Sequence, residues 1–191
     1  MRNILLAVLL VLAFLPLRDA LAKKEAPVIE LHTNKGLIVV ELNPEKAPIT
    51  SENFKKYVED GFYDGTIFHR VIKGFMIQGG GMTSDMQEKE TRESIQNEAD
   101  NGLANNKYTI AMARTMDPHS ASSQFYINSV NNGNLNHKRK DVNGWGYCVF
   151  GKVIEGKEVV DAIEQVDTTS KAGHQNVPVE PVVIEKAVIR Q

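Results

Sequence analysis

The residues of this sequence that are best suited to chemistry lie at positions 68–80, in the run Phe-His-Arg-Val-Ile-Lys-Gly-Phe-Met-Ile-Gln-Gly-Gly. A guanidinium, an aromatic ring, a thioether and a carboxamide follow one another closely in this run. Alternate side chains of a strand share one face, so Met76 and Gln78 lie on the same face if the run is extended. With Arg70 and Phe75 they would form an apolar pocket with two oriented donors, the usual composition of a small-ligand or peptide site.

These residue types also have a purely structural interpretation. Phe75 and Met76 can belong to the core of the domain. Arg70 can form a solvated ion pair, and Gln78 can lie on the surface. Judged by residue types alone, the run favours this structural interpretation.

Other candidate sites lack the spacing that their chemistry needs. The five histidines include no i,i+4 pair and no grouping with cysteine, so we expect no metal site. The glycine run at 79–81 lacks the Gly-Lys-Ser/Thr end of a phosphate-binding loop. Asp117, His119 and Ser120 have the composition of a hydrolase triad, but no Gly-x-Ser-x-Gly motif accompanies them.

The composition restricts the class of protein. With 22 Lys and Arg against 24 Asp and Glu, the formal net charge is −2, which argues against a nucleic-acid-binding protein with a basic surface. An apolar fraction of 42% argues against disorder. The one cysteine, Cys148, cannot close a disulfide within the chain, and we expect its thiol to be buried and inert. The basic run at 138–140 is typical of a solvated loop tip, with contact to acidic partners as the alternative interpretation.

Residues 1–22 have the organisation of a secretory signal peptide. A basic residue precedes the apolar run 4–17, and Ala20 and Ala22 form an Ala-x-Ala cleavage site. The alternative is an uncleaved membrane anchor, but the run is shorter than the roughly 20 apolar residues that a membrane span needs. We therefore expect export, no stable membrane anchoring, and one mature domain over residues 23–191.

Hydrophobic periodicity in the mature chain predicts many short strands and two helices. The strands are expected at residues 28–32, 37–42, 66–72, 75–78, 108–113, 124–128, 147–153 and 182–190. One helix is expected from Pro48 to a stop signal at Gly61, with Thr50 or Ser51 as its cap, and the other at 158–166. This order lacks the regular alternation of a parallel sheet, so we expect an antiparallel barrel or sandwich with helices at its ends.

The run at 68–80 resembles the signature of the cyclophilins, a family of peptidyl-prolyl cis-trans isomerases. Three further blocks match the family in the same order: Ile-Ala-Met-Ala-Arg at 110–114, Ser-Gln-Phe-Tyr-Ile at 123–127 and Val-Phe-Gly-Lys-Val at 149–153. The segment 97–103, Asn-Glu-Ala-Asp-Asn-Gly-Leu, is similar to the version found in bacterial periplasmic cyclophilins. The resemblance implies a mainly β fold: a closed eight-stranded antiparallel β-barrel capped by two α-helices.

The resemblance also implies roles by position. Arg70 matches the catalytic arginine of the family. Nine further residues match positions that bind the peptide: Phe75, Met76, Gln78, Ala113, Arg114, Gln124, Tyr126, Leu135 and Tyr147. No cofactor or metal is implied, because isomerisation neither makes nor breaks a covalent bond.

Four positions differ from the commonest residues of the family. Arg114 replaces an asparagine, Tyr126 a phenylalanine, Tyr147 a histidine, and Asn134 a tryptophan or phenylalanine. In the pocket, the Tyr126 hydroxyl needs a hydrogen-bond partner or a water. Asn134 removes aromatic area, so we expect weak binding of cyclosporin-type inhibitors.

The resemblance therefore implies an isomerase that accelerates rotation about X-Pro bonds in exported proteins and so assists their folding. With the predicted signal peptide, we expect it in the periplasm, or secreted if the source is not a Gram-negative bacterium, and a monomer is the default expectation. Its partners would be proline-containing polypeptides that are unfolded or flexible, and not nucleic acid. Two other classes stay open. A peptide-binding holdase on the same scaffold is favoured by the changes at Asn134 and Tyr147. A structural envelope protein would leave the arrangement around Arg70 unexplained.

Overall fold

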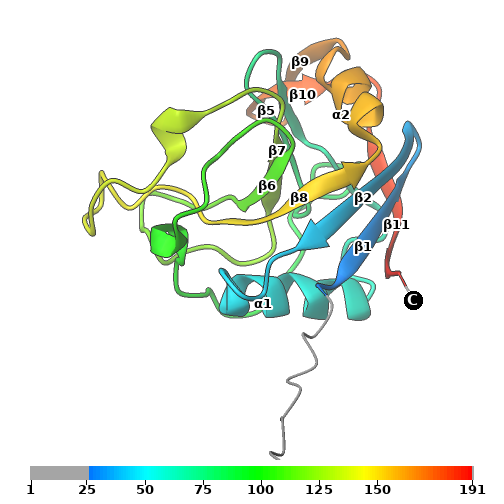
Figure 1. The fold of residues 1–191 in the computed structure, drawn as a ribbon. Helices are drawn as coiled ribbons and strands as arrows, with labels where there is room; N and C mark the ends of the chain where they lie inside the picture. Colours follow the sequence, from blue (N-terminus) through cyan, green and yellow to red (C-terminus); the bar gives the residue numbers. More distant parts are fainter. Residues whose placement is uncertain (1–25, 191) are drawn as a thin grey trace, which may run out of the picture.

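The computed structural model describes residues 26–190, so the predicted signal peptide and its cleavage site lie outside the described residues. Figure 1 shows a strongly curled β-sheet with one helix at each end. Nine strands form this sheet in the order β3-β11-β1-β2-β8-β6-β7-β5-β4, and every neighbouring pair is antiparallel. They are β1 (Val28–Thr33), β2 (Gly36–Leu42), β3 (Thr66–Ile67), β4 (Arg70–Ile72), β5 (Met76–Gly79), β6 (Thr109–Met112), β7 (Phe125–Asn128), β8 (Val149–Glu155) and β11 (Val183–Ile189).

The expected closed barrel of eight strands is not confirmed, because the sheet has nine strands and its edge strands β3 and β4 form no ladder with each other. The strand predicted at 66–72 is divided between them. Phe68 and His69 are both buried, and the Phe68 amide donates to the Val182 carbonyl next to β11. The chain crosses through these two residues from the β11 side of the sheet to the β5 side. The covalent chain thus spans the gap that a ladder would close.

Two helices, α1 (Pro48–Glu59) and α2 (Lys157–Glu164), lie at opposite ends of the curled sheet (Figure 1). Phe54 of α1 and Ile163 of α2 are fully buried, so each helix covers one end of the core. The centre of the core is aromatic: the Phe54 ring packs edge-on against Phe125 at a centroid distance of 5.3 Å and lies 5.2 Å from Phe150. Within residues 26–190, no helix has the length and apolar character that a membrane span requires.

The cap of α1 differs from the expectation. Thr50 and Ser51 both lie inside the helix and neither caps it. The carboxylate of Glu98 takes this role instead, because it accepts hydrogen bonds from the Ile49 amide at 3.1 Å and the Thr50 amide at 2.8 Å. It also accepts the Thr50 hydroxyl at 2.7 Å. A negative charge at this end of a helix is favourable, and it ties α1 to a distant loop.

The first hairpin follows its sequence pattern. β1 buries alternate side chains, including Ile29 and Leu31, and the turn at residues 34–35 returns the chain into β2. Gly36 follows this turn with a φ of +131°, and a Cβ atom there would lie 2.8 Å from Val159 Cγ2. The position therefore requires glycine, both for its backbone angle and for the close approach of α2.

One hairpin was not predicted. It consists of β9 (Thr168–Lys171) and β10 (His174–Pro178), which pair only with each other and pack beside β4. Every residue of β9 is exposed, so no apolar alternation marks it in the sequence. Its turn contains Ala172 and Gly173, both with positive φ, as tight hairpins require.

Candidate active site

Three neighbouring strands bring Arg70 and its predicted partners together. Arg70 of β4 pairs with Gln78 of β5, and Gln78 pairs with Tyr126 of β7. Met76 and Gln78 have the same facing in β5, and the Met76 side chain packs with Tyr126, whereas Ile77 packs into the main core. The alternation predicted from the sequence is confirmed, and it separates the site from the core.

A row of side-chain hydrogen bonds fixes the Arg70 guanidinium. Arg70 Nη1 donates to Gln78 Oε1 at 3.3 Å, and Gln78 Nε2 donates to Gln124 Oε1 at 3.0 Å. Arg70 is half-buried, and it belongs to none of the salt bridges formed among residues 26–190. The guanidinium has five N–H donors, so most of them are available to a ligand.

A small apolar cluster lies on the same face as this row, apart from the main core. Its buried members are Met76, Ala111, Tyr126 and Val149. Six half-buried side chains pack against them: Ile72, Phe75, Leu103, Ala113, Leu135 and Tyr147. The cluster provides a water-poor surface beside a row of polar donors, which is the composition of a peptide-binding pocket.

The hydroxyl of Tyr126 has a protein partner. It donates to Asn105 Oδ1 at 2.7 Å, and both residues are buried. Burial raises the pKa of the Tyr126 hydroxyl well above its usual value, so the group is a neutral donor at every physiological pH. The tyrosine that replaces the usual phenylalanine is therefore accommodated without an unsatisfied polar group.

Asn105 belongs to a network of asparagines beneath the pocket. Its side-chain amide donates to Asn136 Oδ1 at 3.1 Å and to the Tyr147 carbonyl at 3.3 Å. Asn132 Nδ2 donates to the Phe75 carbonyl at 2.8 Å, which anchors the other side of the pocket. These roles were not predicted from the sequence, because the partners of Asn105 and Asn132 lie far away along the chain.

Tyr147 and Arg114 form one wall of the site. The Tyr147 ring meets the Tyr126 ring edge-on at a centroid distance of 5.9 Å, and the Tyr147 amide donates to the Leu135 carbonyl at 3.0 Å. The Arg114 guanidinium stacks over Tyr147 at 4.5 Å and donates through Nε to the Gly146 carbonyl at 3.0 Å. Ala113 continues β6 with its amide bonded to the Gln124 carbonyl at 3.0 Å. Hydrogen bonds, strand pairing, the apolar cluster and the stacked guanidinium thus bring all ten predicted site residues into one neighbourhood.

Beside this wall lies Trp145, the one tryptophan of the chain. The rings of His119 and His137 pack edge-on against it, at centroid distances of 4.7 Å and 5.8 Å. Its indole N–H donates to the Asn97 carbonyl at 3.3 Å, and its own carbonyl bonds His137 Nδ1 at 2.8 Å. These contacts fix the end of the long loop that carries Leu135 and leads to Tyr147.

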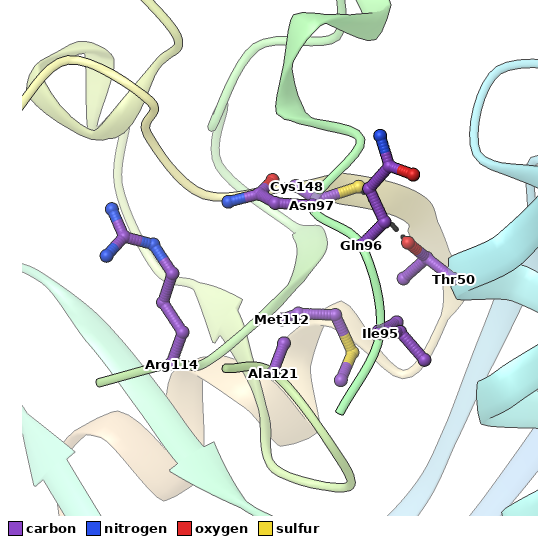
Figure 2. A pocket seen from close by; sticks show the side chains of 8 residues that line it. All are labelled: Thr50, Ile95, Gln96, Asn97, Met112, Arg114, Ala121 and Cys148. Atoms are coloured by element: carbon purple, nitrogen blue, oxygen red, sulfur yellow. Dashed lines mark hydrogen bonds between the residues drawn. The ribbon is translucent and has the colours of Figure 1, made fainter. Parts of the chain in front are cut away.

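A narrow crevice lies behind the site (Figure 2). Its cavity volume is about 10 Å³, at the lower limit for a single water, so it cannot accept a peptide. Cys148 lines it, and burial raises the pKa of this thiol to about 12. Arg114 borders the crevice but extends away from Thr50 on its other side, as Figure 2 shows. The thiol is buried, as predicted from the sequence, and its raised pKa keeps it protonated near pH 7.

His69 is a buried neighbour of the site. Burial, together with the positive charges of His174 and Arg70, lowers the pKa of its ring to about 4. The ring is therefore neutral near pH 7 and adds no charge beside Arg70. Within residues 26–190, no three His, Cys, Asp or Glu side chains gather in an arrangement that could hold a metal ion.

Known proteins share this architecture. Residues 28–189 match the family described as cyclophilin type peptidyl-prolyl cis-trans isomerase/CLD. The chain is 65% identical over 161 residues to a peptidyl-prolyl cis-trans isomerase, cyp18, of Streptomyces antibioticus, with 84% of this chain and 97% of the relative covered. It is 49% identical over 188 residues to a peptidyl-prolyl cis-trans isomerase A of Dickeya dadantii, with 98% of this chain and 97% of the relative covered.

A solved structure is similar as well. A crystal structure of a Cryptosporidium parvum cyclophilin type peptidyl-prolyl cis-trans isomerase, in the presence of the dipeptide Ala-Pro, superposes with a TM-score of 0.70. The sequence identity is 26%, and the match covers 86% of this chain and 99% of the other.

Proposed function

The chain belongs to the cyclophilin-type peptidyl-prolyl cis-trans isomerase family and is an enzyme of that class, and we propose that it isomerises X-Pro bonds in exported polypeptides with Arg70 as its catalytic residue. Its substrates are proline-containing peptides, held in the pocket that Phe75, Met76, Tyr126 and Leu135 surround. The following paragraphs derive how that pocket performs the reaction.

Rotation about an X-Pro amide is slow because resonance gives the bond a barrier of roughly 18–20 kcal/mol. The reaction breaks no covalent bond, so the enzyme needs no nucleophile and no proton transfer. It must hold the proline ring and favour the twisted amide over the two planar forms. Interactions that are stronger in the twisted state than in the planar states lower the barrier.

Arg70 is suited to this task. Twisting localises a lone pair on the prolyl nitrogen, and a permanent N–H donor can then bond to it. Gln78 fixes the guanidinium through Nη1, and Gln124 fixes Gln78 in turn. A donor that is already oriented needs little reorganisation during the reaction. Its hydrogen bond therefore stabilises the twisted amide more than the planar forms.

The apolar cluster complements this donor. Met76 and Tyr126 are almost fully buried and form the floor, while Phe75 and Leu135 are half-buried and accessible to a ring. A proline ring placed there leaves water, which holds it without a directional bond. The ring stays fixed while the peptide on the other side of the amide rotates.

The observation that carries this proposal is the hydrogen-bonded row Arg70–Gln78–Gln124 beside the apolar cluster. We test it by following cis–trans exchange of an Ala-Pro peptide by NMR with the purified protein, Arg70→Ala and Arg70→Lys. Arg70→Ala should lower the turnover rate about a hundredfold, as the loss of one oriented donor does elsewhere, with little change in the peptide dissociation constant.

Arg70→Lys tests the geometry of the same donor. Lysine keeps the charge but lacks the planar fork, so it should recover only a small part of the turnover. Equal losses of turnover and affinity would make Arg70 a binding residue only. Peptide binding without any acceleration in the unaltered protein would identify a peptide-binding module and overturn the enzymatic proposal.

The compartment is a separate part of the proposal. Residues 1–22 have the features of a signal peptide. The match to the Dickeya relative covers 98% of this chain. The match to the Streptomyces relative covers only 84% of this chain, although it covers 97% of that relative. This difference supports a leader added to a complete domain. Amino-terminal sequencing of the protein from the periplasm should begin at Lys23, and recovery of the intact leader would contradict export by cleavage.

Two further expectations concern binding and assembly. Asn134 is exposed and directly precedes Leu135 in the short 3-10 helix Gly133–Leu135. It offers no aromatic surface there, so we propose that cyclosporin-type inhibitors bind weakly and that Asn134→Trp strengthens their binding. We also propose a monomer, which sedimentation velocity would test.

A further inference from the structure

A second cavity adjoins the pocket, with a volume of about 460 Å³. It opens between the segment that follows β6 and the long loop between β7 and β8. Leu135 and Tyr147 line this cavity and also belong to the apolar cluster of the pocket, so the two sites are adjacent. The volume lies in the range of about 300–1,000 Å³ typical of ligand sites, which is enough for a short stretch of peptide.

The charges that line this cavity are all positive. Arg114 and Lys138 line it, no Asp or Glu does, and neither cation belongs to a salt bridge among residues 26–190. The next two basic residues of the loop differ in this respect. Arg139 pairs with Asp141, and Lys140 Nζ lies 2.6 Å from Asp100 Oδ2. Two cations therefore face the cavity without a partner of opposite charge.

One of these cations is held in place. Arg114 donates through Nε to the Gly146 carbonyl and through Nη1 to the Thr115 carbonyl at 2.9 Å, and its guanidinium stacks on Tyr147. A fixed guanidinium loses little freedom when it binds a carboxylate, which favours recognition. Lys138 is exposed. Its ammonium group is a compact charge on a flexible stem, so it can adjust to the position of a carboxylate.

The cavity also has an apolar component. Met116 is 76% exposed and Val142 is 55% exposed, and both line it. Large apolar side chains exposed together mark a binding surface more often than isolated ones do. They suit the apolar stem of a glutamate or an apolar neighbour of an acidic residue.

We propose that this cavity is a specificity subsite for an acidic residue of the substrate, located within a few residues of the proline that the pocket holds. The inference rests on the proposed function, since it requires a proline peptide in the adjoining pocket. The expected ligand is an extended acidic peptide, because the cavity shares Leu135 and Tyr147 with the pocket and its charge is complementary to a carboxylate.

Both cations meet solvent, so the expected preference is modest. Exposed ion pairs contribute little each, and two of them together should favour a glutamate peptide over its glutamine counterpart about threefold. The preference should be present at about 0.01 M salt and absent at about 1 M, where the Debye length falls from about 30 Å to about 3 Å.

The test compares matched peptides. Each carries one Ala-Pro bond and either Glu or Gln at one position, one to three residues before or after the proline. Turnover is measured by NMR exchange and affinity by NMR titration, with the purified protein, Lys138→Gln and Lys140→Gln. Lys140 lies in the same loop but pairs with Asp100, so Lys140→Gln is a control for the change in net charge.

We expect one peptide series to show the Glu preference, Lys138→Gln to lose about half of it because Arg114 remains, and Lys140→Gln to keep it. Lys138→Gln should leave the Gln peptides unaffected. Equal values for Glu and Gln peptides at every position would overturn the proposal, as would a preference that Lys138→Gln retains in full. If no peptide were accelerated, the isomerase proposal would fail, but the dissociation constants would still decide whether the subsite exists.

Discussion

The Tyr126 hydroxyl donates to Asn105 Oδ1 at 2.7 Å, in a place where Asn105 is fully buried and Tyr126 is 4% exposed. The same asparagine donates to the carbonyl of Tyr147 at 3.3 Å. One side chain therefore supports two aromatic residues of the pocket. Positioning of this kind acts through other residues and touches no substrate.

Asn105→Ala should lower the free energy of unfolding by about 2–3 kcal/mol, because it leaves the buried Tyr126 hydroxyl without a partner. Urea denaturation measures this change. In a double-mutant cycle, Tyr126→Phe should recover part of the loss, since it removes the stranded hydroxyl. Strictly additive effects of the two substitutions would contradict the coupling.

Gln124→Met should lower turnover about tenfold while the fold remains stable, because Gln78 loses the acceptor that orients its amide and Arg70 loses its fixed position. NMR exchange gives the turnover, and thermal denaturation gives the stability. The matched control is Gln87→Met, at an exposed position outside the site, which should change neither. Unaltered turnover in Gln124→Met would show that the row does not position Arg70.

Glu98→Ala should lower the free energy of unfolding by about 2 kcal/mol, because two amides at the start of α1 and the Thr50 hydroxyl lose their acceptor. Glu98→Gln should lose less, since one oxygen acceptor remains. Glu52→Ala, an exposed change in the same helix, should cost no more than about 0.5 kcal/mol. Equal values for the Glu98 and Glu52 variants would refute the capping role.

Stability should fall in mild acid because of His69. Its pKa is lowered to about 4 in the folded protein, below the ordinary value of 6.5, so the unfolded chain binds the additional proton between these values. Above about pH 6.5 the protonation of His69 costs the folded protein little. Between pH 6.5 and about pH 5 the free energy of unfolding should fall by about 1.5 kcal/mol. Urea denaturation across this range measures the slope, which His69→Gln should reduce.

NMR titration of the histidine rings gives an independent readout for His69. Its resonances should change with a midpoint near pH 4 in the folded protein. A midpoint near 6.5 would refute the lowered pKa of His69, even if His69→Gln proved too unstable to study.

Local pattern was sufficient for most of the fold. β1 alternates buried and half-buried residues, so its strand could be predicted, and the turn before Gly36 fixed the first hairpin. The pattern failed where burial did not follow it. Phe68 and His69 are consecutive and both buried, which concealed the break between β3 and β4, and the fully exposed β9 left no apolar signal.

The site divides in the same way. Arg70, Phe75, Met76 and Gln78 are close in sequence, so their grouping could be inferred from one run and its resemblance to a known signature. Asn105 could not, because its partners come from distant parts of the chain and an asparagine in a loop has the same composition whether buried or exposed. Glu98 at the start of α1 is a second example, since a cap from a remote loop leaves no local motif.

The position of Trp145 allows the site to be followed by tryptophan fluorescence. It is the only tryptophan of the chain, two residues before Tyr147, and the imidazole rings of His119 and His137 pack edge-on with its indole. Its intrinsic fluorescence therefore reports on one place, without a dye or an engineered label. Peptide binding at the adjoining wall should alter the emission directly, and unfolding should shift it to longer wavelength as the indole enters water. A single optical signal thus serves for both the affinity and the stability measurements.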